Sequence, residues 1–472
     1  MKPGKRVTGM TSIKWMGLLL SIFVFFIPFI FQFEELSVAG HRVLAIFLMA
    51  IVLWVTEAIP LHATASLIIF LNILLVSDKA MMALPEDFKA PTYSSFFYAL
   101  ANPVLMLFLG GFFLADGAAK YKLDKNLAKT LLKPFGTKPS NIILGLMLIV
   151  AVFSMFMSNT ATTAAFMAVV LPVIARLSPS DRGRIALVLC IPIAANVGGM
   201  GTPVGTPPNA IALGALNKAG IHISFLEWMM MIVPFMLILL VFCWQMLVRL
   251  FPTKAETITI EIDSAYDRSP KAIIFYVTAA VTILLWFTEP LHGIQSAIVG
   301  FLPVVVMLST KLITDKEFHS MQWSVLWLVA GGIALGDGVG KTGLDKWLIG
   351  LVDWEHMAPG MIAGALCVAA LLFSTIISNS ATANLLVPIG ISLTASPDIA
   401  ISPITSAIFI AIGSSLAMSL PISTPPNAIA YSTGQIQTKQ MALTGVFIGL
   451  VGMLLFIYAA PLIWNIFGIM PD

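Results

Sequence analysis

Two short polar motifs interrupt apolar stretches of this chain, and each motif occurs twice. Ser158-Asn159-Thr160 in the first half matches Ser378-Asn379-Ser380 in the second, and Thr206-Pro207-Pro208-Asn209 matches Thr424-Pro425-Pro426-Asn427. Hydroxyl and amide groups both donate and accept hydrogen bonds. Ser and Thr also favour helix starts, where free N–H groups attract anions. The motifs therefore predict a site for a small anion, with side-chain oxygens that also suit a small hard cation.

The paired prolines carry a second expectation. Two consecutive prolines break a helix, and in both copies they lie within a long apolar segment. The freed carbonyls need a partner other than lipid, and a Na⁺ ion held by carbonyl and hydroxyl oxygens would supply one. Kinking and packing of membrane helices would explain one copy of such a motif equally well. Two matched pairs favour a binding site.

The sequence around the Ser-Asn motifs contains no fixed positive charge. No Lys or Arg occurs between Met155 and Val173, or between Ile376 and Pro388. Helix ends, amides and cations bound together with the anion would therefore have to neutralise it. Because a dianion alone is costly inside a membrane, this pattern predicts coupling of the anion to cations.

The composition indicates a membrane protein. Of 472 residues, 58% are hydrophobic and 10% are charged, whereas roughly a quarter are charged in soluble domains. We therefore expect an all-α polytopic membrane protein, whose helices satisfy the backbone hydrogen bonds internally. A net charge of +3 is too small to suggest a nucleic-acid partner. The three cysteines stand singly in apolar runs and are expected to be packing residues.

The length of the apolar stretches predicts about 11 transmembrane helices and two re-entrant helical hairpins. The hairpins cover about 140–176 and 357–396, and a Ser-Asn motif breaks each in the middle. This topology makes the N-terminus cytoplasmic and the C-terminus external, and it places most of the 26 basic residues inside. The crossings are expected near 15–33, 42–59, 63–77, 95–118, 184–216, 226–250, 270–288, 294–310, 322–340, 401–436 and 441–465.

Further landmarks recur in the same order, at offsets of 218 to 232 residues. Trp54-x-Thr56-Glu57 returns as Trp286-x-Thr288-Glu289, and Gly110-Gly111 with Asp116 returns as Gly331-Gly332 with Asp337. An odd number of crossings in each half predicts an inverted-topology repeat, which is typical of transporters. The expected organisation is an N-terminal segment with the first span at 1–41, repeat 1 at 42–250, a cytoplasmic linker at 251–269 and repeat 2 at 270–472.

The paired motifs, together with the Asn-Val-Gly-Gly-Met-Gly run at 196–201, resemble the divalent anion/sodium symporter family, the INDY-type sodium/dicarboxylate transporters. The resemblance covers nearly the whole chain. It implies a homodimer in the cell (inner) membrane, with a scaffold domain and an elevator-type transport domain in each protomer. It also implies symport of Na⁺ with C4-dicarboxylates such as succinate, malate and fumarate. The protein would then have at least two sodium sites.

The resemblance also assigns residues. The substrate would contact Asn159, Thr160, Asn379 and Ser380, with Thr206, Pro207, Thr424 and Pro425 nearby. One sodium site would use Ser154, Ser158, Asn159 and the backbone of Gly205, and the other would use Ser374, Ser378, Asn379 and Ser423. Ser380 stands where the family more often has Thr, which leaves the size of the substrate open.

Several alternatives remain at this stage. They are a Na⁺-independent dicarboxylate exchanger, a Na⁺-coupled transporter of citrate or sulfate and, more distantly, an anion channel. No nucleophile-base constellation suggests an enzyme, and the histidine spacing does not indicate zinc. Asp116 and Asp337 are expected to cap or order loops, and Glu57 and Glu289 to cap helices or snorkel.

Overall fold

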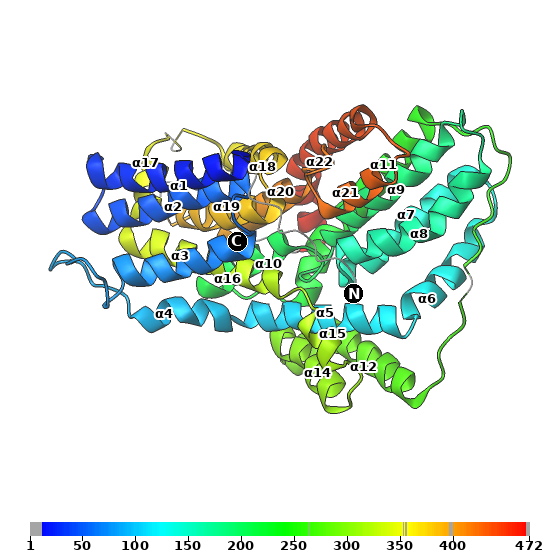
Figure 1. The fold of residues 1–472 in the computed structure, drawn as a ribbon, viewed down its shortest axis with the longest axis horizontal. Coiled ribbons are helices and arrows are strands. Elements are labelled where there is room, and N and C mark those ends of the chain that lie inside the picture. The colour runs from blue at the N-terminus through cyan, green and yellow to red at the C-terminus, as the bar shows by residue number, and fades with distance from the viewer. Residues whose placement is uncertain are drawn as a thin grey trace, which may run out of the picture.

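The computed structural model describes residues 12–468, except for 263, 353, 355, 396–398 and 400. The described residues form helices and connecting segments and contain no strand (Figure 1). The helices are α1 Ser12–Ile30, α2 Val38–Thr56, α3 Leu61–Val76, α4 Tyr93–Phe97, η1 Tyr98–Ala101, α5 Pro103–Lys120, α6 Leu123–Leu132, η2 Lys133–Phe135, α7 Pro139–Phe156, α8 Asn159–Arg176, α9 Gly183–Gly199, α10 Pro207–Lys218, α11 Phe225–Leu250, α12 Pro270–Phe287, α13 Glu289–His292, α14 Ser296–Ser309, α15 Asp315–His319, α16 Trp323–Thr342, α17 Leu344–Gly350, α18 Pro359–Ile376, α19 Asn379–Leu393, α20 Pro403–Ser415, α21 Pro425–Ser432 and α22 Thr438–Ile466.

Within the described residues, nine helical segments are long and apolar enough to cross a membrane. Six of them coincide with predicted crossings, and the other three are the hairpin arms α7, α8 and α18. The remaining predicted crossings fall on shorter apolar helices, which lie at Lys14–Ile30, Leu61–Val76, Gly183–Gly199, Ser296–Ser309 and Pro403–Ser415. Length and apolarity thus support a multi-pass membrane protein but do not separate a crossing from a hairpin arm.

The helix breaks expected from the motifs are confirmed. Helix α7 ends at Phe156 and α8 begins at Asn159, while α18 ends at Ile376 and α19 begins at Asn379. Helix α9 packs against both α7 and α8, and α20 packs against both α18 and α19. Each Ser-Asn motif is therefore the tip of a helix pair, and a third helix packs along both arms.

The proline pairs also interrupt helices as expected, and they occupy the first turn of the following helix. Helix α10 begins at Pro207 and α21 begins at Pro425, so the stretches at 184–216 and 401–436 are each two helices joined by a segment of turns and irregular backbone. Proline fits the first turn because the N–H groups there have no partner within the helix.

Helices from the two halves of the chain pack closely against each other at glycines. Helix α5 packs along α14, and α16 packs along α3. A Cβ on Gly110 of α5 would collide with the backbone of Gly300 in α14, and one on Gly331 of α16 would collide with Ala65 in α3. The matched glycines therefore allow a close approach of helices from opposite halves.

The linker at 251–269 is irregular in its described residues, and one buried carboxylate anchors it. Asp181, between α8 and α9, accepts hydrogen bonds from the N–H of Gly183 (2.8 Å), the hydroxyl of Thr253 (2.9 Å) and the N–H of Lys254 (3.1 Å). Burial alone would raise the pKa of Asp181, but these hydrogen bonds outweigh it and hold the pKa below the ordinary value of 3.8.

Two expectations about acidic residues are wrong, and a third is wrong in part. Asp116 and Asp337 lie inside helices α5 and α16 rather than in loops, and Asp337 is buried and paired with Lys218. Glu289 lies in the first turn of α13, which agrees with a place at a helix start, but it does not snorkel. It is buried and accepts hydrogen bonds from His222 (2.9 Å) and Ser296. By contrast, Glu57 is the exposed residue that caps the end of α2.

Gly110→Ala tests the close packing of α5 on α14. We expect a loss of stability of about 1–3 kcal/mol, because the methyl group displaces two backbones that cannot yield locally. Thermal unfolding in detergent measures it as a lower Tm. Gly360→Ala in α18 is the control, since no atom of the described residues outside that helix turn lies within 4 Å of the added methyl group. An equal Tm for the two variants would contradict this packing.

Asp181→Asn tests the anchor of the linker. A carboxylate whose pKa is lower in the folded than in the unfolded state stabilises the protein at pH values above the unfolded pKa. This contribution is lost as the pH falls from the unfolded pKa through the folded pKa. We expect the variant to lose about 1.5–3 kcal/mol near neutral pH, because it gives up hydrogen bonds to a charged acceptor. The difference in Tm between the two proteins should shrink below about pH 4. A difference that does not depend on pH would show that the charge of Asp181 has no role.

Candidate functional site

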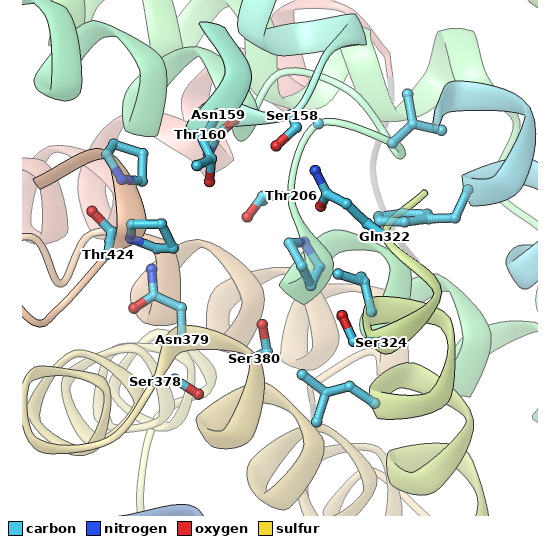
Figure 2. Close-up of a pocket in the computed structure, with 18 of the residues that line it drawn as sticks. Ser158, Asn159, Thr160, Thr206, Gln322, Ser324, Ser378, Asn379, Ser380 and Thr424 are labelled. Atoms are coloured by element: carbon cyan, nitrogen blue, oxygen red, sulfur yellow. The ribbon is translucent and has the colours of Figure 1, made fainter. Parts of the chain in front are cut away.

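The tips of both helix pairs and both broken segments meet at one cavity of about 360 Å³, called the tip cavity here. Figure 2 shows Ser158, Asn159 and Thr160 facing Ser378, Asn379 and Ser380 across it, with Thr206 and Thr424 between them. All the residues assigned to the substrate by resemblance line this cavity: Asn159, Thr160, Thr206, Pro207, Asn379, Ser380, Thr424 and Pro425. Positions far apart in the sequence are thus brought to one place.

The first tip is held by a cluster of three oxygens. The hydroxyl of Ser154, one turn before the tip, lies 2.5 Å from Oδ1 of Asn159 and 2.8 Å from the carbonyl oxygen of Ala195. Glycine at position 199 brings the end of α9 against the same side chain, because a Cβ there would lie 2.6 Å from Oδ1 of Asn159. The amide of Asn159 is therefore fixed in orientation from two sides.

The second tip repeats this cluster. The hydroxyl of Ser374 lies 2.8 Å from Oδ1 of Asn379 and 2.7 Å from the carbonyl oxygen of Ser414. Glycine does not recur beside this tip, because 415–421 reads Ser-Leu-Ala-Met-Ser-Leu-Pro. The two tips share their hydrogen bonds but differ in the backbone packed against them.

The residues assigned to sodium are divided between the cavity wall and the layer behind it. Those on the wall are Ser158, Asn159, Gly205, Ser378, Asn379 and Ser423, whereas Ser154 and Ser374 are fully buried behind Asn159 and Asn379. Each assigned set offers neutral hydroxyl, amide and backbone oxygens. Among the described residues, no cluster of three His, Cys, Asp or Glu side chains could hold a metal. Neutral hydroxyl, amide and carbonyl oxygens fit a monovalent hard cation better than zinc or calcium.

The helix starts around the cavity differ in how they are capped. Ser158 and Thr206 precede α8 and α10 and accept no capping hydrogen bond on their side chains. Ser378 accepts one from the N–H of Ala381, and Thr424 accepts one from the N–H of Asn427, both at 3.3 Å. The first-half helices therefore present more free N–H groups to an anion in the cavity.

The asparagine that ends each Thr-Pro-Pro-Asn motif has a role that the sequence did not reveal. The amide nitrogen of Asn209 donates to the carbonyls of Gly199, Met200 and Thr202 at 2.7–3.1 Å. Asn427 donates in the same way to Met418 (2.8 Å) and Leu420 (3.0 Å). Side-chain amides thus satisfy several carbonyls of the broken segments, which the sequence had left to a bound cation.

Other cavity residues stand outside the repeated motifs and were missed. Asn196 donates to Oγ1 of Thr424 (3.1 Å) and to Oδ1 of Asn427 (3.2 Å), and so connects the two broken segments. Gln322 and Ser324, at the start of α16, face the tips across the cavity (Figure 2). His62 also belongs to the lining. Only Asn196 carried a signal, since it opens the glycine-rich run.

The described lining of the tip cavity includes no Lys, Arg, Asp or Glu, and His62 is its one titratable side chain. Hydroxyls, amides and helix starts make up the rest of its polar surface. A cavity of this kind can coordinate small cations through oxygen and carboxylate groups through N–H and O–H donors, provided that the bound charges balance.

Comparison with known proteins agrees with this geometry. Residues 12–470 match the model of the family described as "Sodium:sulfate symporter transmembrane region". The sodium-dependent dicarboxylate transporter SdcS of Staphylococcus saprophyticus is 30% identical over 481 residues, which cover 93% of this chain and 89% of that protein. An uncharacterized transporter of Haemophilus influenzae is 31% identical over 471 residues, with 94% and 96% covered.

Among solved structures, the YdaH transporter of Alcanivorax borkumensis superimposes with a TM-score of 0.57 at 13% identity. The superposition covers 87% of this chain and 99% of that one, so the likeness concerns the fold alone. The family match and the full-length relatives confirm the resemblance seen in the motifs, and the chain belongs to the divalent anion/sodium symporter family.

Proposed function

We propose that this protein couples the movement of Na⁺ to the transport of C4-dicarboxylates across the cell membrane. One observation carries the proposal. Two oxygen clusters, centred on Asn159 and Asn379, flank a cavity that has uncapped helix starts and no Lys or Arg in its described lining. Its relatives named sodium-dependent dicarboxylate transporters support the same ions and substrate class.

The proposed chemistry follows from charge balance. Na⁺ ions held by the oxygens assigned beside each tip would place positive charge next to the cavity. The carboxylates of the substrate would then accept hydrogen bonds from the amides of Asn159 and Asn379 and from the hydroxyls of Thr160 and Ser380. Because neither ion is stable there alone, binding of the cations favours binding of the anion, and the reverse holds by linkage.

The proposed movement is of the elevator type. The tips, α9–α10 and α20–α21 would move together against a scaffold that includes α5 and α16. Gly111 of α5 packs on Val204, and Gly332 of α16 packs on Asn384 of α19, so glycines lie at both of these boundaries. The inverted repeat, the eleven crossings with two re-entrant hairpins, the cytoplasmic N-terminus and the homodimer all belong to this proposal.

Two alternatives remain distinct in practice. A Na⁺-independent exchanger would use the same cavity without an ion gradient, and a transporter of sulfate or citrate would differ in preferred anion. Ser380 has one methyl group fewer than the Thr that is more usual in the family, which leaves the size of the preferred anion open. An anion channel is disfavoured because a site built from two opposed tips predicts occlusion rather than a continuous pore.

Uptake of labelled succinate into proteoliposomes tests the proposal. We expect uptake that depends on an inward Na⁺ gradient and proceeds without internal substrate. Unlabelled malate, fumarate, citrate and sulfate, each added in excess, would rank the anions. Uptake that ignores Na⁺ but requires internal succinate would replace the symporter with the exchanger.

Asn159→Ala and Asn379→Ala test the two tips. Each change removes the amide that joins an oxygen cluster to the cavity, and we expect at least about a hundredfold loss of Na⁺-driven uptake, the scale of a lost charge-assisted contact. Asn141→Ala is the control, because Asn141 is exposed near the start of α7, far along the helix from the tip. Near-normal uptake by folded tip variants would show that the substrate binds elsewhere.

A further inference from the structure

A second cavity, of about 700 Å³, lies beside the tip cavity along helices that line both. Along α5, Val104 and Leu107 line the second cavity, and Phe108, Gly111 and Phe112 line the tip cavity. This second cavity is called the lysine cavity below, after Lys218 and Lys341 in its wall.

Helix α16 shows the same division in the opposite chain direction. Ser324 and Leu328 near its start line the tip cavity, while Ile333, Asp337 and Lys341 further along line the lysine cavity. In the broken segment before α10, Pro203 faces the lysine cavity and its neighbour Val204 faces the tip cavity. The two cavities therefore lie next to each other along these elements, and the residues between them form a barrier.

The charges of the two cavities differ. The lining of the lysine cavity includes two lysines, one histidine and one aspartate. Lys218, the last residue of α10, pairs with the buried carboxylate of Asp337 on α16. Lys341 donates to the hydroxyl of Ser95 (3.3 Å) and lies 5.7 Å from the centre of the Phe96 ring. The other carboxylate beside this cavity, Glu289, contacts His222 of the lining (2.9 Å). Lys341 is therefore the lining lysine that no carboxylate in the described residues pairs with.

The comparable lysine at the end of α5 is neutralised. Lys120 holds the position that the repeat matches with Lys341, and its Nζ lies 2.7 Å from the carboxylate of Glu317. Lys341 occupies the matching position of the second repeat, but no carboxylate pairs with it among the described residues. The unpaired lysine therefore occurs only at the end of α16, and not at the matching end of α5.

We propose that the lysine cavity is a second anion-binding site, which holds the dicarboxylate at the face of the protein opposite to the tip cavity. This inference rests on the proposed function and adds a place where the substrate gathers before or after it crosses the barrier. A cavity with an excess of one sign of charge concentrates the opposite ion. Lys341 attracts the first carboxylate, and the second carboxylate competes with Asp337 for Lys218.

The ion pair also spans a boundary of the proposed movement, because α10 is part of the moving body and α16 is part of the scaffold. An anion that displaces Asp337 from Lys218 would loosen this contact. Substrate in the lysine cavity would thus favour the movement that brings the tips toward it.

Labelling of an introduced cysteine tests the proposal independently of transport. The native cysteines at 190, 243 and 367 are fully buried, so Asn217→Cys adds a reactive thiol in the wall of the lysine cavity. We compare the rates for a sulfonate-bearing and a trimethylammonium-bearing methanethiosulfonate reagent. We expect the anionic reagent to react about tenfold faster, and succinate to slow that reaction.

Charge variants in this background identify the cause. Lys341→Gln should bring the two rates close together and abolish protection by succinate, because Lys218 and Asp337 then cancel. Asp337→Asn should instead increase the ratio of the anionic to the cationic rate, because it removes a negative charge from the cavity. Lys346→Gln, which changes an exposed lysine outside the described lining, is the control and should leave the ratio unchanged.

Equal ratios in the Lys341→Gln and parent proteins, or charge-dependent labelling without protection by succinate, would overturn the proposal. Protection by succinate in a chain that shows no Na⁺-driven uptake would instead contradict the proposed function and leave the lysine cavity as an anion site.

Discussion

A dicarboxylate loses its hydration when it enters a membrane protein, and something in the protein must replace that water. The tip cavity offers hydroxyls, amides and helix starts, without Lys or Arg in its described lining. A fixed lysine there would hold the anion whether or not cations were bound. Neutral donors hold it well only when mobile cations complete the charge balance. The absence of fixed charge is thus what would make coupling to Na⁺ obligatory under the proposed function.

Much of the remaining architecture follows from this need for neutral donors. Helix starts and free carbonyls are available only where helices end, so a site of this kind requires helices that are broken beside the cavity. Prolines occupy the first turns of α10 and α21, where the backbone N–H groups have no partner within the helix. Asn209 and Asn427 then satisfy carbonyls that lipid could not. The broken segments are stable because amides of their own motifs support them.

The features that recur within the sequence were the ones that it could predict. A duplicated motif indicates both its chemistry and its partner, so both tips and both helix breaks could be predicted, while the composition predicted the membrane class. Single-copy contacts offered no such comparison. Asn196, the buried Glu289 and the pair of Lys218 with Asp337 join residues from distant segments. Only the packed chain decides which of the many polar residues in such a sequence meet.

The repeat also implies more symmetry than the structure has. The hydroxyls of Ser154 and Ser374 contact Asn159 and Asn379 in the same way, but Gly199 closes on the first tip and has no counterpart in 415–421. Helices α8 and α10 start uncapped, whereas Ser378 and Thr424 cap α19 and α21. A capped N–H already has an acceptor and offers less to a carboxylate. The first half therefore offers more to the anion, and the second half relies more on the hydroxyl and amide of its tip. Two sodium sites built on such unequal tips would bind with unequal affinity, although their side-chain ligands are alike.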